Sequence, residues 1–271
     1  MRLLSGRDLA SYIKERQAQQ VHRLRAQGIV PGLAIVVTID NPVTNTYIRL
    51  KSRYGADIGV KVDIHRVPQD EVESLLESLS LNDSVHGIIV QLPLSDKAQT
   101  DKIVNLVPPE KDVDGLGDAS IFDPATPLAI LWLINGYNIE LTGKQVLLVG
   151  QGRLVGAPLK KLLIASGINP VVADKETKDL KAETLKADVI ITATGVHGVI
   201  KPNMLKKNAI LVDAGVAGEG GKTVGDIASE VYAERDDLTI TPQKGGVGPL
   251  TVCALFDNVI RAAEGEATDK R

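Results

Sequence analysis

The stretch that most constrains the fold of this chain is Gln145–Pro158, QVLLVGQGRLVGAP. Its apolar residues 146–149 predict a buried strand, and glycines follow at 150, 152 and 156. Apolar residues then recur at helical spacing, and Pro158 falls in the first helical turn, where a missing N–H costs little. A strand, a glycine turn and a helix N-terminus make an anion site, because free N–H groups and the helix dipole face whatever lies over the turn. The physical interpretation is a site for the pyrophosphate of a dinucleotide.

The glycine spacing departs from the usual dinucleotide fingerprint. It is G-x-G-x-x-x-G instead of G-x-G-x-x-G, so that Gly156 comes one place late. A glycine turn after a strand is often only a tight connection, and the turn alone therefore does not establish cofactor binding. The flanking strand and helix are what favour it.

Bulk properties exclude several classes of protein. The chain has 271 residues, enough for two domains, and 44% hydrophobic with 24% charged residues is typical of a soluble globular protein. A formal net charge of −3 gives no reason to expect nucleic acid or a membrane surface as a partner. The single cysteine, Cys253, excludes a cysteine metal cluster, and the histidines lack metal-ligand spacing. With no signal-type N-terminus and no membrane-spanning run, we expect a cytoplasmic protein without a metal site.

The first half of the chain predicts a series of strand–helix units. The pattern predicts strands at 32–39, 59–67 and 85–90, and helices at 5–27, from a cap at Thr44 or Asn45 onward, and at 70–79. Three such units in a row imply a parallel sheet with a pocket at the carboxyl ends of its strands.

Tyr47 and Lys51 lie four residues apart in the second of these helices and so share one face. The ordinary interpretation of an isolated Y-x-x-x-K is an amphipathic helix with a solvated lysine. The alternative is a catalytic lysine beside an aromatic ring, since burial lowers the pKa of a lysine and makes it usable as a base.

Two further segments follow the predicted strands. Gln91 ends the third strand and precedes an apolar Leu-Pro-Leu at 92–94, which suits the edge of a pocket, although alone it is an ordinary loop residue. Residues 108–115, PPEKDVDG, contain a D-x-D-G that could suggest calcium. The twelfth position of such a loop is Asp123 and not glutamate, so we set calcium aside.

The second half of the chain predicts a Rossmann-type domain. A helix at 124–137 leads into it, strands are expected at 146–149, 169–173, 187–193 and 209–213, and a last helix at 249–263. The second of these strands ends at Asp174-Lys175, roughly 24 residues beyond Gly150, where ribose recognition belongs.

Several motifs occur in one order along the chain. They are DNPxT at 40–44 before Tyr47 and Lys51, VQLPL at 90–94, PEKDVDG at 109–115, PATP at 124–127, VGQGRLVGAP at 149–158 and ITPQKGGVGPLTV at 240–252. This set resembles the methylenetetrahydrofolate dehydrogenase/cyclohydrolase family over nearly the whole chain. The resemblance implies an α/β fold: an N-terminal βα catalytic domain with a parallel sheet, residues 1–123 completed by the C-terminal helix 248–271, and a Rossmann-type dinucleotide-binding domain, residues 124–247. The active site would lie in the cleft between them.

The family oxidises 5,10-methylenetetrahydrofolate to 5,10-methenyltetrahydrofolate with a nicotinamide cofactor and usually hydrolyses the product to 10-formyltetrahydrofolate. By resemblance, Lys51 is the catalytic lysine, Tyr47 stacks on or orients the folate, Gln91 contacts Lys51, and Asp114 holds the pterin ring, for which a carboxylate that accepts N–H bonds is well suited. Leu92, Gly248 and Pro249 join Tyr47 and Asp114 as substrate-binding residues. The residues implied at the cofactor are Gly150, Gln151, Gly152, Arg153, Gly156, Asp174, Lys175, Gly195 and Val216. The resemblance also suggests a homodimer.

The chain departs from the family at the predicted cofactor loop. The family usually has Gly-Arg-Ser at 150–152 and His-Ser at 174–175, and these groups favour a 2′-phosphate. An acid at Asp174 favours the free ribose hydroxyl of NAD, whereas Lys175 and Arg153 can pair with the phosphate of NADP. We expect NADP, with NAD possible. The 115–124 segment is also shorter than in the family by roughly a dozen residues, Ala125 replaces a cysteine, and Lys244 stands where proline is usual.

Two other readings compete with this one. Short-chain dehydrogenases also use Y-x-x-x-K, but there the tyrosine follows the glycine turn, whereas Tyr47 precedes it here by about a hundred residues. A monofunctional or degenerate NAD(P)-binding member of the same fold would explain the altered cofactor loop. Retention of Tyr47, Lys51, Gln91 and Asp114 together speaks against it.

Overall fold

The computed structural model describes residues 1–219 and 222–269, which form two compact units. One unit contains residues 1–10 and 126–251, and the other contains residues 11–125 and the chain from 252 onward. This differs at the N-terminus from the sequence-based division, which assigned residues 1–123 to the first domain. The reason is strand β1 (Arg2–Leu3), which pairs in parallel with β11 (Thr239–Ile240) and so extends the sheet of the nucleotide-binding unit. Each unit is described by itself below.

The unit that begins at residue 11 contains a three-stranded sheet in the order β3-β2-β4. Both strand pairs are parallel, as predicted from the repeated strand–helix units. The strands are β2 (Gly32–Val37), β3 (Lys61–Arg66) and β4 (Gly87–Gln91). The helices are α1 (Gly6–Ala26), α2 (Pro42–Ile58), α3 (Val72–Ser80), α4 (Thr100–Val104) and α9 (Val247–Asp269), with 3-10 turns at Gln69–Glu71 and Lys97–Gln99. The first five residues of α1 and of α9 belong to the other unit.

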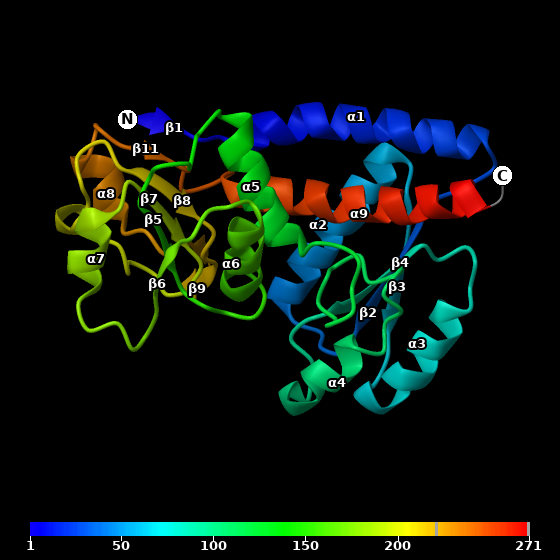
Figure 1. Ribbon diagram of the computed structural model, residues 1–271. Coiled ribbons are helices and arrows are strands. Elements are labelled where there is room, and N and C mark those ends of the chain that lie inside the picture. The colour runs from blue at the N-terminus through cyan, green and yellow to red at the C-terminus, as the bar shows by residue number, and fades with distance from the viewer. Residues whose placement is uncertain (220–221, 270–271) are drawn as a thin grey trace. The chain divides into compact units, whose positions relative to one another are not determined.

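Both faces of this sheet are covered by helices, as Figure 1 shows: α3 and α4 on one side, and α2 and α9 on the other. Toward α3 and α4, alternate residues of β2 and β4 form a buried cluster with apolar residues of both helices; its members include Ala34, Val36, Val72, Leu76, Leu79, Ile88, Val90, Ile103 and Val104. On the other side, a Cβ at Gly55 of α2 would lie 2.5 Å from Val62 and 3.1 Å from the ring of Phe256. Glycine at this position therefore lets α2 pack closely on both β3 and α9.

Helix α2, which carries Tyr47 and Lys51, begins earlier than expected. Its N-cap is Asn41, whose side chain accepts a hydrogen bond from the Thr44 N–H at 2.8 Å. The expectation that Thr44 or Asn45 caps the helix is wrong, because Pro42 occupies the first helical position, where proline is favoured. A firm cap fixes the start of the helix that presents Lys51, which lies ten residues after Asn41.

The other unit contains a six-stranded sheet in the order β1-β11-β8-β7-β5-β6, with every pairing parallel. Its remaining strands are β5 (Val146–Val149), β6 (Val171–Ala173), β7 (Val189–Thr192) and β8 (Ile210–Asp213), and β9 (Ala217–Glu219) pairs antiparallel with β10 (Lys222–Val224). The helices are α5 (Ala125–Gly136), α6 (Gly156–Ala165), α7 (Leu180–Lys186) and α8 (Ser229–Glu234), with a 3-10 turn at Pro202–Met204.

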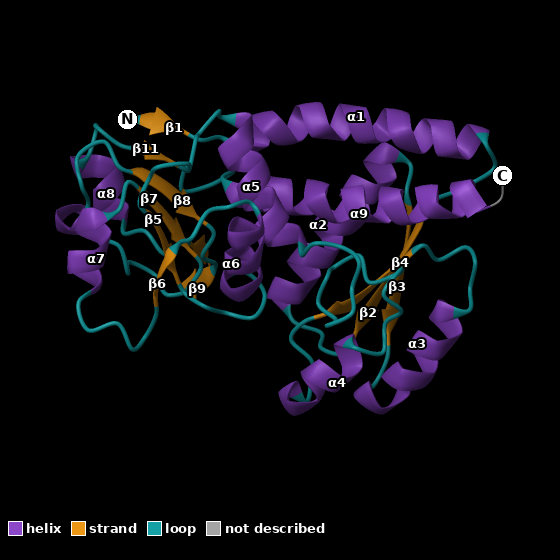
Figure 2. Cartoon of the chain, viewed as in Figure 1, coloured by secondary structure: helices purple, strands orange, loops and turns teal. Residues whose placement is uncertain are grey.

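Helices lie on both faces of this larger sheet, α5 and α6 on one and α7 and α8 on the other (Figure 2). Strand β6 lies on one side of β5, and the chain then crosses to β7 on the other side. Such a reversal of strand order leaves a crevice at the carboxyl ends of the two central strands, which is where ligands of open parallel sheets bind. The predicted Rossmann-type topology is confirmed.

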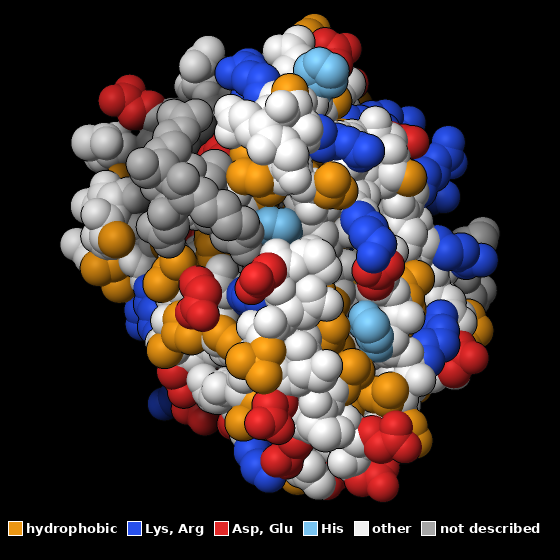
Figure 3. Space-filling view, turned by 90° about the vertical axis from the view of Figure 1, so that its right-hand side faces the viewer, with side chains coloured by type: hydrophobic (Ala, Val, Ile, Leu, Met, Phe, Trp, Pro, Cys, Tyr) orange, Lys and Arg blue, Asp and Glu red, His pale blue; other side chains and the backbone are white. Residues whose placement is uncertain are grey.

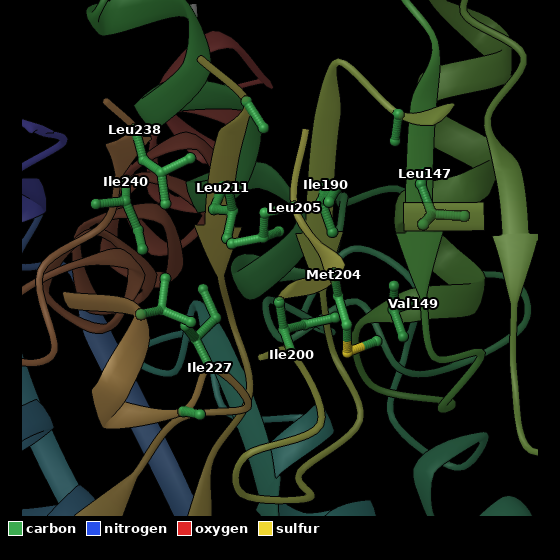
Figure 4. Packing of buried hydrophobic residues seen from close by; sticks show 14 of the residues in the cluster. Leu147, Val149, Ile190, Ile200, Met204, Leu205, Leu211, Ile227, Leu238 and Ile240 are labelled. Atoms are coloured by element: carbon green, nitrogen blue, oxygen red, sulfur yellow. The ribbon is translucent and has the colours of Figure 1, made fainter. Parts of the chain in front are cut away.

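One face of the larger sheet packs into a continuous apolar cluster. Figure 4 shows Leu147, Val149, Ile190 and Leu211 of the central strands against side chains from the segments that follow. Met204, Leu205 and Ile227 complete this layer. The core therefore holds β5, β7 and β8 in fixed register, and their carboxyl ends are positioned with it.

The surface is of mixed polarity. On the face in Figure 3, basic and acidic side chains alternate with small groups of hydrophobic ones. Among the described residues, no helix is both long enough and apolar enough to cross a membrane.

Candidate active site and nucleotide site

Lys51 forms the centre of the polar cluster in the sheet unit with β2–β4. Its ammonium group donates to Oε1 of Gln91 at 3.0 Å, which joins α2 to the last residue of β4. The Gln91 amide in turn donates to the carbonyl of Leu92 at 3.0 Å, so its oxygen is turned toward the lysine. The contact between Lys51 and Gln91 that the family resemblance implies is thus present in the structure.

Burial lowers the pKa of Lys51, because a charged ammonium loses hydration there, and the nearby carboxylate of Asp114 partly opposes this by favouring the charged form. The Gln91 oxygen is an acceptor that suits either protonation state. Tyr47, one turn earlier on α2, remains 37% exposed. An amine of lowered pKa beside a partly exposed aromatic ring can exchange a proton with a bound ligand.

Asp114 belongs to a loop that is anchored on both sides. The Ile88 N–H of β4 donates to the carbonyl of Lys111 at 2.7 Å, and the Lys111 ammonium donates to the carbonyls of Ser80 and Asn82 at the end of α3. Asp112 is buried, and its carboxylate accepts from the Gly117 N–H at 2.8 Å. Burial raises the pKa of Asp112, while the Gly117 N–H acts in the opposite direction.

The C-terminal helix supplies the other anchor of this loop. Asn258 of α9 is fully buried and donates from one amide nitrogen to the carbonyl of Val113 at 2.9 Å and to that of Asp123 at 3.0 Å. It therefore ties residue 113 to residue 123, at the two ends of the loop between them. Between these ends, the Ser120 hydroxyl donates to the Asp112 carbonyl at 3.0 Å.

Sequence reasoning did not identify Lys111, Asp112 or Asn258 as parts of the site. The sequence pattern marks Asp112 only as a candidate calcium ligand. Among the described residues, no cluster of His, Cys, Asp or Glu could hold a metal ion. Asn258 had a usable signal, since it is an amide on a helix stripe whose neighbours are Leu255, Phe256 and Val259. A buried polar side chain on an apolar stripe normally has a specific partner.

In the nucleotide-binding unit, the glycine turn follows β5 as predicted. Gly150 has a φ of 102°, in the region that favours glycine, and a Cβ there would lie 2.5 Å from the Ala193 carbonyl oxygen. A Cβ on Gly156 would lie 2.1 Å from the Gly150 carbonyl oxygen. The late third glycine therefore lets the start of α6 pack directly on the turn, which is the role of the third glycine in the standard fingerprint.

The middle glycine of the turn faces open space. A Cβ on Gly152 would have only one neighbour, the Ala193 oxygen at 4.0 Å, and the residue is exposed. Gln151 lies back on the turn and donates to the Gly150 carbonyl at 3.3 Å, and Arg153 is exposed. An open glycine backbone at the N-terminus of α6 fits the close approach of a diphosphate.

Asp174 follows β6 and lies in a tight local turn. Its carboxylate accepts from the Glu176 N–H at 2.9 Å through Oδ1, and its own N–H donates to the Thr177 hydroxyl at 2.9 Å. Asp174 and Lys175 are both exposed. The acid is thus held in place by its own loop, whereas Lys175 is simply exposed.

The other predicted cofactor residues follow the next strands of the sheet. Gly195, with a φ of 68°, comes after β7, and Val216, which is 54% exposed, comes after β8. Because β6, β5, β7 and β8 are adjacent and parallel, the segments with Asp174, Gly150, Gly195 and Val216 all emerge at one edge of the sheet. This is the edge at which the strand order reverses.

Gly248 and Pro249 lie in the first turn of α9, which begins two residues before the predicted start. Nothing lies within 4 Å of a Cβ placed on Gly248. The preceding turn is braced by the N-terminal segment: the Arg7 N–H donates to the Gly245 carbonyl at 3.1 Å, and a Cβ on Gly6 would lie 1.8 Å from the Gly246 oxygen. Only glycine at position 6 allows this backbone contact.

Comparison with known families identifies both units. The catalytic-domain model of the tetrahydrofolate dehydrogenase/cyclohydrolase family matches residues 4–114, and its NAD(P)-binding-domain model matches residues 124–267. A curated relative, "Bifunctional protein FolD" of Helicobacter hepaticus, is 36% identical over 277 residues, which cover 97% of this chain and 96% of that protein.

Solved structures agree with these matches over the full length. The bifunctional enzyme FolD of Campylobacter jejuni superposes with a TM-score of 0.92 at 34% identity, covering 98% of this chain and 99% of that one. The methylenetetrahydrofolate dehydrogenase-cyclohydrolase of Trypanosoma brucei, solved with NADP and an inhibitor, gives a TM-score of 0.91 at 27% identity and covers 98% of each chain.

Proposed function

This chain belongs to the tetrahydrofolate dehydrogenase/cyclohydrolase family, and from that premise we propose that it catalyses both reactions of the family. It oxidises 5,10-methylenetetrahydrofolate to 5,10-methenyltetrahydrofolate with a nicotinamide dinucleotide and hydrolyses the product to 10-formyltetrahydrofolate. The observation that carries the proposal is the hydrogen bond from Lys51 to Gln91, with Asp114 close enough to act on the charge of the lysine.

In the proposed site, the folate lies against Tyr47 and Leu92, and its pterin donates N–H groups to Asp114. Gly248 and Pro249 offer further surface for the same ligand. A charged hydrogen bond of this kind contributes about 1.5–3 kcal/mol, so Asp114 both binds and orients the ring. The nucleotide supplies a hydride acceptor when bound.

The nucleotide itself is held by the segments at the carboxyl edge of the larger sheet. Its diphosphate lies over the Gly150–Gly156 turn, where Gly152 and Arg153 are exposed before the start of α6 and Gln151 lies back on the turn. Gly195 and Val216 border the same edge. These assignments rest on the open backbone at Gly152 and on the common edge of the four strands.

Lys51 acts in the hydrolytic step. Attack of water on the methenyl carbon requires a group that accepts a proton from the water, and an amine of lowered pKa is a better candidate for this than an ordinary lysine. Gln91 fixes the position of the amine through the 3.0 Å hydrogen bond. The proton then passes to the folate nitrogen whose bond to that carbon breaks.

The test replaces Lys51 by methionine, which keeps the length of the side chain but has no amine. Lys51→Met should abolish cyclohydrolase activity while the protein stays folded. Arg49→Met, an exposed position on the same helix, is the matched control and should keep the parent rate. Hydrolysis of methenyltetrahydrofolate by folded Lys51→Met at near the parent rate would refute the role of the lysine.

For the cofactor we infer NADP, by a small margin over NAD. If Lys175 turns toward the ribose, it pairs with the 2′-phosphate, and Lys175→Ala lowers kcat/KM for NADP alone, more strongly at low salt. Asp174→Ser should shift preference further toward NADP, because it removes a carboxylate that repels the phosphate. A parent enzyme that prefers NAD more than tenfold would overturn the choice of NADP.

Three related expectations remain predictions: that folate and nucleotide meet in a cleft between the domains, that the enzyme is a homodimer, and that it is cytoplasmic. Sedimentation of the purified protein tests the dimer directly. The monofunctional alternative is tested by the absorbance of methenyltetrahydrofolate on mixing enzyme, methylenetetrahydrofolate and NAD or NADP.

A further inference from the structure

Two aspartates beneath the proposed nucleotide site are not needed for any step above. Asp226 is fully buried, and both of its carboxylate oxygens accept from backbone N–H groups of the segment after β7. Oδ2 accepts from Thr194 at 2.7 Å and Oδ1 from Val196 at 3.0 Å. These two N–H groups flank Gly195, so the carboxylate fixes the loop on either side of that glycine.

Asp213, the last residue of β8, fixes the neighbouring segments in the same way. Its Oδ1 accepts from the N–H groups of Gly215 at 3.0 Å and Asp226 at 3.1 Å, and from the Thr192 hydroxyl at 3.1 Å. Its Oδ2 accepts from the Ile227 N–H at 3.1 Å. Asp213 therefore holds the loop that leads to Val216 and also the segment that carries Asp226.

The two carboxylates also pack directly on glycines. A Cβ on Gly215 would lie 1.9 Å from Oδ1 of Asp226, and a Cβ on Gly225 would lie 2.1 Å from Oδ2 of Asp213. Each aspartate thus occupies the space that a side chain on the opposite segment would fill. Neither glycine has a positive φ, so the close approach of a carboxylate, and not backbone conformation, requires glycine at these positions.

We propose that Asp213 and Asp226 are positioning residues, which together hold the Gly195 loop and the Val216 loop in the conformation that binds the nicotinamide dinucleotide. The proposal rests on the proposed function for the identity of the ligand. Its basis is that the hydrogen bonds run from carboxylates to loops at the carboxyl edge of the sheet, where a Rossmann-type unit binds its ligand.

Neutral side chains could not replace this arrangement. Both oxygens of Asp226 face N–H donors, so an amide of the same shape can satisfy only one and turns its own NH₂ group toward the other. The N–H groups of Thr194 and Val196 are already used by the carboxylate and are not donors for a phosphate. The diphosphate is therefore directed to the open turn at Gly152. The Gly195 loop contributes to the site through its backbone conformation and not through N–H donors.

The test is Asp226→Asn, measured by calorimetric binding of NADP and NAD and by amide hydrogen exchange of residues 193–198. We expect at least tenfold weaker nucleotide binding, faster exchange in that segment, and cyclohydrolase activity within about twofold of the parent. The matched control is Asp188→Asn. Asp188 also accepts a backbone N–H, from Gln145 at 2.9 Å, but it lies before β7, at the amino end of the sheet. The Asp188→Asn variant should lower the stability of the protein without changing its affinity for the nucleotide.

A second variant covers the case in which Asp226→Asn does not fold. Thr192→Val keeps the shape of the side chain and removes only one hydroxyl donor to Asp213. It should weaken nucleotide binding severalfold and speed exchange at 214–216. The proposal is overturned if folded Asp226→Asn binds the nucleotide as tightly as the parent, or if Thr192→Val does so when Asp226→Asn is unfolded. It is also overturned if Asp188→Asn loses as much nucleotide affinity as Asp226→Asn.

The hydrogen-exchange measurement separates this proposal from the proposed function. If the parent binds neither nucleotide, the proposed function fails and the ligand part of this proposal fails with it. Faster exchange confined to 193–198 and 214–216 would still support the positioning of the two loops, and unchanged exchange would contradict it.

Discussion

Replacing Asn258 by leucine tests whether the C-terminal helix positions the loop that carries Asp114. Leucine has the branching of asparagine, although its methyl groups are bulkier, but it cannot donate to the two carbonyls at the ends of residues 113–123. Because Asn258 is fully buried, water cannot easily take its place. The change therefore removes two hydrogen bonds without opening a cavity in the core.

The magnitude follows from the fate of each polar atom. Val113 is fully buried, and an unsatisfied buried carbonyl costs about 1–3 kcal/mol. Asp123 is exposed, so water can replace its bond at a cost of roughly 0.5–1 kcal/mol. Oδ1 of Asn258 has no hydrogen-bond partner among the described residues, and removing it regains about 1 kcal/mol. The net loss in the free energy of unfolding is about 2 kcal/mol, or roughly 4–8 °C in Tm.

Thermal unfolding of the apo protein measures this loss, and steady-state kinetics measure its consequence. If the loop that carries Asp114 is less firmly held, the KM for folate should rise severalfold while the affinity for NADP stays near the parent value. Asn45→Leu is the matched control, because the hydrogen bonds of Asn45 are solvent-exposed and should contribute little. A Tm within 1 °C of the parent, or equal losses for folate and nucleotide, would refute the argument.

Three further predictions follow from single contacts. Gly156→Ala should weaken nucleotide binding at least tenfold with cyclohydrolase activity retained, since the new Cβ would lie 2.1 Å from the backbone oxygen of Gly150. Calorimetric binding of the nucleotide measures this loss, and an affinity equal to that of the parent would contradict the proposed turn. Asp114→Asn should lower the pKa of Lys51 further, because the Asp114 charge opposes the effect of burial, so the lysine should titrate at lower pH in a ¹³C NMR titration; a shift to higher pH would show the opposite coupling. The Arg235 guanidinium holds the pKa of Asp237 well below its usual range, so this stabilisation is present above the unfolded pKa of about 3.9 and is lost as pH falls through the lower folded pKa. Arg235→Lys should therefore lower Tm at pH 7, and the difference from the parent should shrink in acid; a constant difference down to pH 2 would exclude the linkage.

Much of the fold was predictable because the central strands are buried on both faces. Continuous apolar runs such as 146–149 and 32–37 correspond to central strands, and the alternation with helices required parallel pairing. The short strands β1 and β11 were not predicted as a pair, since two-residue strands have no periodicity in the sequence. Their pairing depends on a contact between residues more than two hundred positions apart.

Some features of the candidate site were likewise predictable from the sequence, and others required the structure. Tyr47 and Lys51 follow from helical spacing, and the glycine turn follows from its strand and helix, because local geometry fixes both. The late Gly156 looked like a departure from the fingerprint, and only the 2.1 Å approach to Gly150 explains it. The lowered pKa of Lys51 likewise required the structure, since burial depends on every element that packs around the amine.

The sequence by itself determined the strands, the helices and the chemical groups available, because these depend on local periodicity and residue type. Tertiary structure alone decided which distant residues support them. Asn258 reaches Val113 across 145 positions and Asp226 reaches Thr194 across 32, and in each case the partner is a backbone group. Every residue except proline carries the same backbone N–H and carbonyl groups, so no sequence pattern marks the ones that a buried side chain will bind.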